Sequence, residues 1–169
     1  MKKFLLASLV LLLAVGCSTP KTKTSKYQKG NDAVKEDIGN VKVEVENENG
    51  EKISIPLFNG MEEVNDIALE AQFGIKKDDV ENYIIATPIV DDTKLYIAIK
   101  PKKGREDLIK QKIEIYLSVL EQRLSDTSKD KAALVHDCLK KQLNGYSIYI
   151  VTDKDKVDSI YKIFEDNLK

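Results

Sequence analysis

The runs Tyr83-Ile-Ile-Ala-Thr-Pro88 and Leu95-Tyr-Ile-Ala-Ile99 decide the fold of this chain of 169 residues. Both are rich in β-branched and aromatic residues, which favour strands. Neither alternates strictly between apolar and polar residues, as a strand with one face in water would. We therefore expect both strands to be buried on both faces and to lie centrally in a sheet. Asp91-Asp92, between them, is typical of a turn.

A hairpin is predicted upstream of these strands. Every second residue from Val41 to Val45 is a valine with a charged residue between, the period of a half-buried strand. Asn49-Gly50 follows, and both residues accept the positive φ of a type I′ turn. The alternation resumes from Ile53 to Ile55 on the expected return strand, and Pro56 ends regular pairing.

A helix is predicted from about Gly60 to Phe73. Asn59 is expected to cap its N-terminus, with Glu62 as the capping-box partner. Gly74 is expected to supply a left-handed C-cap. The apolar stripe of this helix comprises Met61, Val64, Ile67, Ala68 and Ala71.

Two further helices are predicted after the central strands. Gly104 begins a long pattern in which apolar residues recur at steps of three and four. These residues are Leu108, Ile109, Ile113, Tyr116, Leu117, Leu120 and Leu124. Thr127 and Asp130 form another capping box, for a helix that Asn144-Gly145 is expected to end. The stripe of that second helix comprises Ala132, Val135, Cys138, Leu139 and Leu143.

The C-terminal part is predicted to contain one strand and one helix. Tyr146 to Val151 favours a strand, and Thr152 with Asp155 is expected to cap the final helix. Its buried stripe comprises Val157, Ile160, Tyr161, Phe164 and Leu168. The predicted order is β-β-α-β-β-α-α-β-α. We expect an α+β fold, a two-layer sandwich in which helices cover an antiparallel or mixed sheet of about five strands.

The N-terminal stretch Met1–Cys17 has the layout of a secretory signal peptide. Two lysines precede an apolar run from Phe4 to Val15, and small Gly16 stands directly before Cys17. As a helix the run is about 18 Å long, too short to span a hydrocarbon core of roughly 30 Å. The end of the stretch, Leu-Ala-Val-Gly-Cys17, resembles the lipobox of bacterial lipoproteins. This resemblance implies that Cys17 becomes the first mature residue and that its sulfur carries diacylglycerol.

The lipobox divides the chain into three expected parts. Residues 1–16 form a signal peptide that is removed, and residues 17–40 comprise the lipidated cysteine and a flexible polar tether. Residues 41–169 form a single α+β domain. Two or more acyl chains, palmitate among them, anchor a protein stably, so we expect a location on the outer face of the cell membrane. The alternative is an ordinary secretory signal in which the cysteine is incidental.

Several motifs of the mature chain together resemble a known family. They are Phe73-Gly-Ile-Lys-Lys-Asp-Asp-Val-Glu-Asn-Tyr83, the strand exit from Ile97 to Lys103, the long helix with Arg123, and Asn144-Gly-Tyr-Ser-Ile-Tyr-Ile-Val-Thr152. With the lipobox and the polar tether, they make the chain similar to the domain-of-unknown-function family four-three-five-eight, small lipoproteins of low-GC bacteria. The similarity covers roughly residues 61–164. It implies no catalytic residue, because the family has no assigned activity.

Charge and cysteine content narrow the classes of function. Of the 27 Lys and Arg residues, two lie in the expected signal peptide, which leaves 25 basic residues against 28 acidic ones. This balance gives no electrostatic reason to expect a nucleic-acid partner. With Cys17 lipidated, Cys138 is alone, so an intrachain disulfide is not expected. No glycine-rich phosphate loop is present, and no cofactor is expected.

The candidate binding residues belong to a basic loop. Lys100, Lys102, Lys103 and Arg105 lie between an expected strand and the long helix. They could bind an anion such as a phosphate, a lipid headgroup or a teichoic-type polymer, with the helix N-terminus contributing. The alternative interpretation is a solvated loop around a turn glycine.

No catalytic or metal-binding set is expected. His136, the only histidine, is predicted to lie on a solvated helix face. Cys138, two residues later, points to another face and is predicted to be buried in the core. The acidic clusters, including Asp153-Lys-Asp155, do not match the EF-hand pattern and are better explained as caps and turns.

Two functions from different classes remain open at this point. The first is a lipid-anchored binding or interaction module of the cell envelope, which holds a partner protein or a wall polymer near the membrane. The alternative is a small extracytoplasmic hydrolase with a site assembled from scattered serines, His136 and acidic residues. A solute receptor of a transport system is disfavoured, because the chain is small and shows no two-lobed repeat.

Overall fold

The computed structural model describes residues 35–46, 49–89 and 93–168. The expected signal peptide, Cys17 and most of the expected tether lie outside these residues, as does the turn predicted at Asp91-Asp92. Within the described ranges, no helix combines the length and the apolar character needed to cross a membrane.

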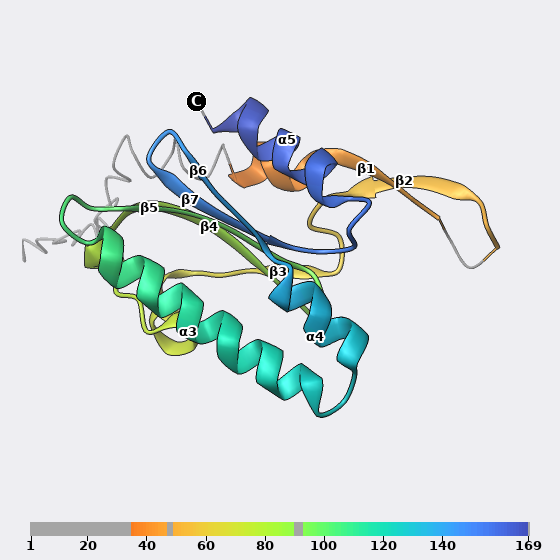
Figure 1. Ribbon diagram of the computed structural model, residues 1–169. Coiled ribbons are helices and arrows are strands. Elements are labelled where there is room, and N and C mark those ends of the chain that lie inside the picture. The colour runs from red at the N-terminus through yellow and green to blue at the C-terminus, as the bar shows by residue number, and fades with distance from the viewer. Residues whose placement is uncertain (1–34, 47–48, 90–92, 169) are drawn as a thin grey trace, which may run out of the picture.

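The main sheet has five strands in the order β3-β4-β5-β7-β6, and every neighbouring pair is antiparallel. Their bounds are Met61–Glu63 for β3, Val80–Pro88 for β4, Leu95–Pro101 for β5, Leu139–Leu143 for β6 and Tyr146–Val151 for β7. β5 lies at the centre, between β4 and β7 (Figure 1). The predicted central position of β4 and β5 is confirmed, because each has a neighbouring strand on both sides.

Side chains of β5 enter two separate cores, because successive residues of a strand point to opposite faces. Ile97 and Ile99 belong to the core on one face, and Tyr96 and Ala98 belong to the core on the other. No residue from Leu95 to Ile99 is more than 3% exposed. A fully buried side chain of this size contributes roughly 1.5–3 kcal/mol. Both faces of β5 must therefore be covered by other elements.

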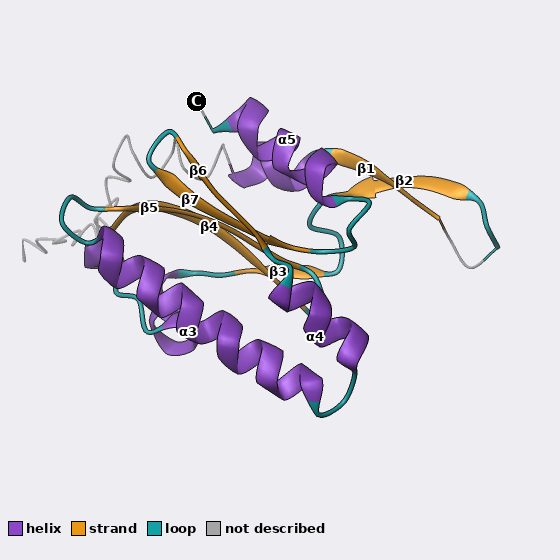
Figure 2. Ribbon diagram, in the orientation of Figure 1, coloured by secondary structure: helices purple, strands orange, loops and turns teal. Residues whose placement is uncertain are grey.

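Helices cover both faces of the sheet (Figure 2). Their bounds are Asp66–Phe73 for α2, Glu106–Ser125 for α3, Lys129–His136 for α4 and Val157–Asn167 for α5, with a short 3₁₀ turn η1 at Lys77–Asp79. α2, α3 and α4 pack on the Ile97 face, and α5 and the helical residues 35–40 pack on the Tyr96 face. The predicted α+β class is confirmed. The structure has three layers instead of the predicted two, because β5 and β7 present apolar side chains on both faces of the sheet.

β1 (Lys42–Glu46) and β2 (Lys52–Pro56) form the predicted hairpin as a separate, antiparallel two-stranded sheet. The hairpin extends away from the main sheet (Figure 1). Gly50 has a φ of +78°, which favours glycine. Glu46 pairs with Lys52, so the connection spans residues 47–51 and is longer than the loop of a type I′ turn.

The helix predicted over residues 60–73 begins later than expected. Met61–Glu63 forms β3 instead, which pairs with the end of β4. Asn65, rather than Asn59, caps α2, since its Oδ1 accepts a hydrogen bond from the Ala68 N–H at 2.9 Å. The C-cap at Gly74 is as predicted.

The later start changes which residues of α2 face the core. Leu69 and Phe73 are buried, whereas Ile67, which the prediction placed in the apolar stripe, is 82% exposed. The backbone groups of Met61–Glu63 form hydrogen bonds with β4 instead of the bonds of a first helical turn. This strand pairing thus outweighs the capping signal at Asn59.

The helix predicted from Thr127 to Asn144 is divided into a helix and a strand. Ser128, not Thr127, caps α4. β6 follows and forms a hairpin with β7, across the two-residue loop Asn144-Gly145. Asn144 and Gly145 have φ values of +50° and +84°, the positive values that a type I′ turn requires. Asn144-Gly145 therefore marks a hairpin rather than the end of a helix.

Residues 35–40 are helical and lie within the range expected to be the tether. Ile38 is fully buried in the core of the Tyr96 face. Lys35 Nζ lies 4.5 Å from the centroid of the Tyr83 ring. A Cβ atom on Gly39 would lie 2.8 Å from Phe58 Cδ2, so this position accepts only glycine without a shift. The packed structure thus begins upstream of Val41, where order was expected to start.

Replacing Asn65 with alanine tests the revised start of α2. The Asn65→Ala protein loses the N-cap bond, and its free energy of unfolding falls by about 1 kcal/mol in urea titration. Asn59→Ala is the matched control and leaves that free energy within about 0.5 kcal/mol of wild type. A larger loss for Asn59→Ala than for Asn65→Ala would restore the predicted helix start.

Candidate functional site

The candidate site is a groove between the hairpin and α5, with a volume of about 490 Å³. We call it the hairpin groove. Residues 41–45 form one wall, Ile160 and Ile163 of α5 form the other, and Tyr96 and Thr152 lie at its floor. Its size falls within the roughly 300–1,000 Å³ that is typical of ligand-binding clefts.

The two strands at the centre of the sheet supply the floor. Tyr96 is the second residue of β5, and Thr152 directly follows the last residue of β7. The register pairs Leu95 with Val151, which places Tyr96 and Thr152 near the same end of the paired strands. Tyr96 also stacks against Phe58, with 6.3 Å between ring centroids.

Thr152 is a buried polar residue whose hydroxyl lies near the Tyr96 hydroxyl but makes no hydrogen bond of regular geometry. The residue is 3% exposed, and its Oγ1 has no hydrogen-bond partner within the described part of the chain. Such a group costs about 1–3 kcal/mol relative to a satisfied one. A ligand in the groove that donates to or accepts from this hydroxyl would recover that free energy.

The Tyr96 hydroxyl is kept neutral by its surroundings. Burial raises the pKa of Tyr96, the neighbouring Thr152 hydroxyl lowers it, and the Asp153 carboxylate raises it, with a net increase over the usual value. At neutral pH the group is therefore a hydroxyl that donates one hydrogen bond. Together, Tyr96 and Thr152 offer hydroxyl groups at the base of a groove lined by both apolar and polar residues.

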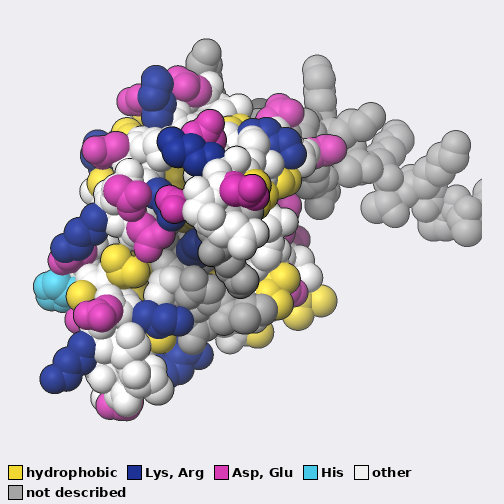
Figure 3. Space-filling view, turned by 90° about the vertical axis from the view of Figure 1, so that its right-hand side faces the viewer, with side chains coloured by type: hydrophobic (Ala, Val, Ile, Leu, Met, Phe, Trp, Pro, Cys, Tyr) yellow, Lys and Arg dark blue, Asp and Glu magenta, His cyan; other side chains and the backbone are white. Residues whose placement is uncertain are grey.

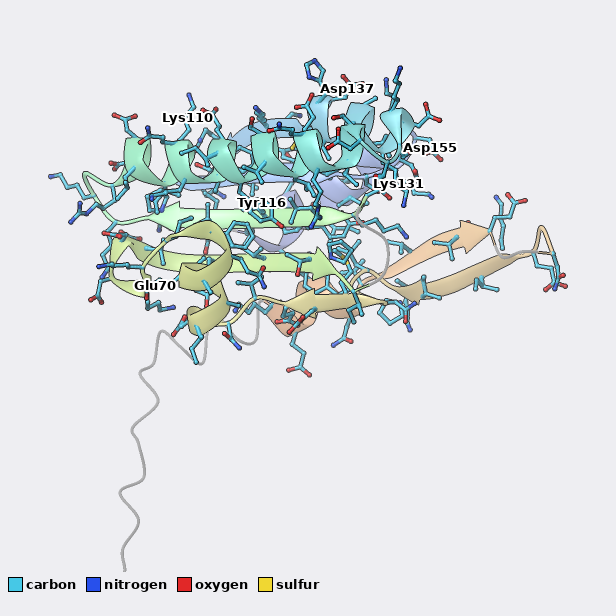
Figure 4. All side chains as sticks on the ribbon, turned by 90° about the horizontal axis from the view of Figure 1, so that it is seen from below. Glu70, Lys110, Tyr116, Lys131, Asp137 and Asp155 are labelled. Atoms are coloured by element: carbon cyan, nitrogen blue, oxygen red, sulfur yellow. The ribbon has the colours of Figure 1, made fainter. Side chains whose placement is uncertain are left out.

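Charged residues surround the mouth of the groove. Lys156 Nζ pairs with Asp153 Oδ2 at 2.7 Å, and this bond raises the pKa of Lys156 against the opposing effect of burial. Lys94 also lines the groove and has no ion-pair partner among the residues described. Asp155, labelled in Figure 4, lies at the end of the body from which the hairpin extends. The groove thus offers charges of both signs beside its apolar side chains.

Thr152 was predicted to cap the final helix, and this prediction is wrong. α5 begins after Lys156 and has no side-chain cap, and Thr152 lies upstream of the helix in the groove floor. The only feature of the sequence that could have indicated the groove floor is Thr152, a hydroxyl residue directly after the apolar strand from Tyr146 to Val151. This signal is weak, because a polar residue at a strand end is ordinarily a turn residue.

The basic loop does not converge on one point. Lys100 Nζ pairs with Glu81 at 3.1 Å, and Arg105 Nε pairs with Asp79 at 3.1 Å. Lys102 and Lys103 are exposed. The anion-binding role of these residues stays a prediction, and two of the four cations already have acidic partners.

His136 and Cys138 lie apart from the groove. His136 is 72% exposed at its side chain, and its Nδ1 lies 3.2 Å from Glu121 Oε1. Figure 3 shows the histidine at the molecular surface, among charged side chains of both signs. Cys138 is buried as predicted, and burial raises the pKa of its thiol to about 11. A thiol with this pKa is a poor nucleophile at neutral pH.

Acidic residues do not gather into a metal site in the described ranges. No group of three or more His, Cys, Asp or Glu side chains there is arranged to hold a metal ion. Two acidic residues instead form ion pairs: Asp153 pairs with Lys156, and Asp79 pairs with Arg105.

Replacing Thr152 with valine separates a binding role from a structural one. Thr152→Val removes a buried hydroxyl that makes no hydrogen bond of regular geometry, so the free energy of unfolding rises by about 1 kcal/mol, measured by urea titration. Thr87→Val is the matched control on β4, because the Thr87 hydroxyl donates to the Glu62 carbonyl at 3.4 Å. That protein is no more stable than wild type. If Thr152→Val were clearly destabilised instead, Thr152 would have a structural partner.

The match to known proteins concerns the sheet rather than the groove walls. A family model described as a domain of unknown function (DUF4358) matches residues 56–152. No curated protein and no solved structure matches the chain. The matched range includes β3 to β7 and the floor residues Tyr96 and Thr152, but neither β1 nor α5. Because the match covers more than half of the 169 residues, the chain belongs to the DUF4358 family.

Proposed function

We propose that the protein is a lipid-anchored lipoprotein on the outer face of the cell membrane, and that it binds an envelope component in the hairpin groove. The observation that supports a binding role is the buried Thr152 hydroxyl, which makes no hydrogen bond of regular geometry, at the floor of a groove of about 490 Å³. Buried polar groups in folded proteins ordinarily have a hydrogen-bond partner, so a ligand group that bonds to this hydroxyl would account for it. The component is a partner protein or a wall polymer.

The anchoring part of the proposal is supported by the sequence from Met1 to Cys17. A charged start, a short apolar run and the ending Leu-Ala-Val-Gly-Cys17 match the requirements for lipidation at the cysteine. Cys17 would be followed by a polar segment with four lysines before the described structure begins at Lys35. Such a segment would hold the groove near the membrane while leaving it accessible.

The hydrolase alternative has no comparable support. His136 would have to act as the general base, but its described polar partner is Glu121 on an exposed surface. Tyr96 and Thr152 have hydroxyl groups but no histidine beside them to activate a nucleophile. Binding therefore remains the better interpretation of the groove.

Replacing Cys17 tests the anchor in the full-length chain. Cells that express Cys17→Ser incorporate no alkyne-labelled palmitate into the protein, because the serine oxygen cannot form the thioether. Cys138→Ala is the matched control, since it removes the buried thiol, and its labelling equals that of wild type. Labelling is measured in gels after coupling to a fluorophore. Palmitate incorporation into Cys17→Ser would contradict the anchor.

Replacing Ile163 tests the groove. Ile163→Glu places a charge on the α5 wall, so the immobilised full-length protein loses what it retains from solubilised envelope proteins and wall-polymer fragments. Ile115→Glu is the matched control, because Ile115 is 53% exposed on α3 and does not line the groove. Mass spectrometry compares the retained components, and circular dichroism confirms that both variants are folded. Identical retention by the two variants would count against the groove as the binding site.

A further inference from the structure

The free edge of β1 lines the hairpin groove. Successive side chains of a strand point to opposite faces, so a strand that presented one face would line a groove with alternate residues only. Every residue from Val41 to Val45 lines this groove. Ile55 and Leu57 line it as well, on the same face of the hairpin as the valines. The wall therefore combines this apolar face with the edge of β1, where Lys42 and Glu44 lie.

The register identifies the main-chain groups on this edge. The Leu57 N–H donates to the Val41 carbonyl at 2.8 Å, so Val41 and Leu57 form a hydrogen-bonded pair. Hydrogen-bonded and non-hydrogen-bonded pairs alternate along an antiparallel ladder, which places Lys42 and Glu44 in non-hydrogen-bonded pairs. The N–H and C=O groups of Lys42 and Glu44 thus point away from β2. They have no backbone partner in the described part of the chain.

The opposite edge of the hairpin is interrupted by a proline at its base. Pro56 lies across from Lys42 in a non-hydrogen-bonded pair, so its ring occupies the position of an outward N–H. Proline on an edge strand is a recognised device against strand addition. β1 has no proline between Lys42 and Glu46. Of the two edges, the one toward the groove has no proline and is the better template for another strand.

We propose that the hairpin groove binds an extended polypeptide segment, which adds to β1 as a third strand. This inference rests on the proposed function, because it names the class of ligand for the same groove. The ligand main chain pairs with the outward groups of Lys42 and Glu44. Alternate ligand side chains enter the space beside Ile160 and Ile163, which favours apolar residues at every second position.

A peptide satisfies the groove better than an acyl chain does. An acyl chain has no donor or acceptor along its length, so it would cover the outward groups of Lys42 and Glu44 and the Thr152 hydroxyl without bonding to them. Each group left in this way costs about 1–3 kcal/mol. A peptide main chain provides donors and acceptors at the strand repeat. The ammonium group of Lys94 at the mouth can in addition pair with a carboxylate of the ligand.

The first step of the test is the selection of a binder. Random peptides of about eight residues, long enough to span the β1 wall, are displayed on phage and selected on the purified full-length protein. The most enriched peptide is synthesised, and its affinity is measured by isothermal titration calorimetry. We expect its sequence to carry apolar residues at alternate positions.

Proline substitution on the two hairpin edges then tests strand addition. Glu44→Pro removes an outward N–H but leaves the bonds to β2 intact, because Glu44 and Ser54 form a non-hydrogen-bonded pair. We expect the affinity for the selected peptide to fall about tenfold or more. Ser54→Pro makes the same change on the other edge, outside the groove, and keeps the wild-type affinity. The peptide amides are also methylated one at a time, a change that leaves the protein fold untouched. We expect the affinity to fall when the methylated amide is at every second position of the peptide.

The outcomes separate the inference from the proposed function. If Glu44→Pro binds the peptide as tightly as Ser54→Pro, while Ile163→Glu does not bind it, strand addition is overturned and the groove remains the binding site. If all three variants bind equally, both proposals fail. Failure to enrich any peptide overturns the inference. A dimer formed through the β1 edges of two copies, detected by light scattering, overturns it as well.

Discussion

The central strand β5 has to be kept from water on both of its faces, and the rest of the structure depends on this constraint. From Leu95 to Ile99 the strand has no polar side chain to offer to solvent other than the Tyr96 hydroxyl. β4 and β7 satisfy its backbone groups, and helices on both faces bury its side chains. A two-layer fold would cover only one face of this sheet and leave the other apolar face exposed, so a third layer is required.

The two covering layers are unequal, and the groove follows from the difference. On the Ile97 face, the 20-residue helix α3 runs along the sheet together with α2 and α4. On the Tyr96 face, α5 has 11 residues, and the remaining cover comes from residues 35–40 and the base of the hairpin. These separate pieces meet over Tyr96 and Thr152 without filling the space between them. The groove is thus the place where the thinner layer is assembled from elements distant in the chain.

Sequence patterns were reliable where burial is uniform along an element. The strands β4, β5 and β7 and the long helix α3 each have a periodicity that one environment explains. The patterns failed at Met61–Glu63 and Leu139–Leu143, the two edge strands of the sheet. Edge strands are short and partly exposed, so their side chains resemble those of an amphipathic helix. The nearby signals, Asn59 with Glu62 and Asn144-Gly145, are compatible with either structure, and strand pairing decided between them.

By itself, the sequence determined the α+β class, the central strands, the hairpin at the start of the domain and the buried state of Cys138. These features follow from local propensity and from the hydrophobic pattern of each segment. Only the tertiary structure decided that helices cover both faces, that β1 and α5 line one groove, and that Thr152 lies in that groove instead of capping a helix. The physical reason is that burial of a hydroxyl and access to a strand edge are properties of packing between distant segments, and no local pattern encodes them.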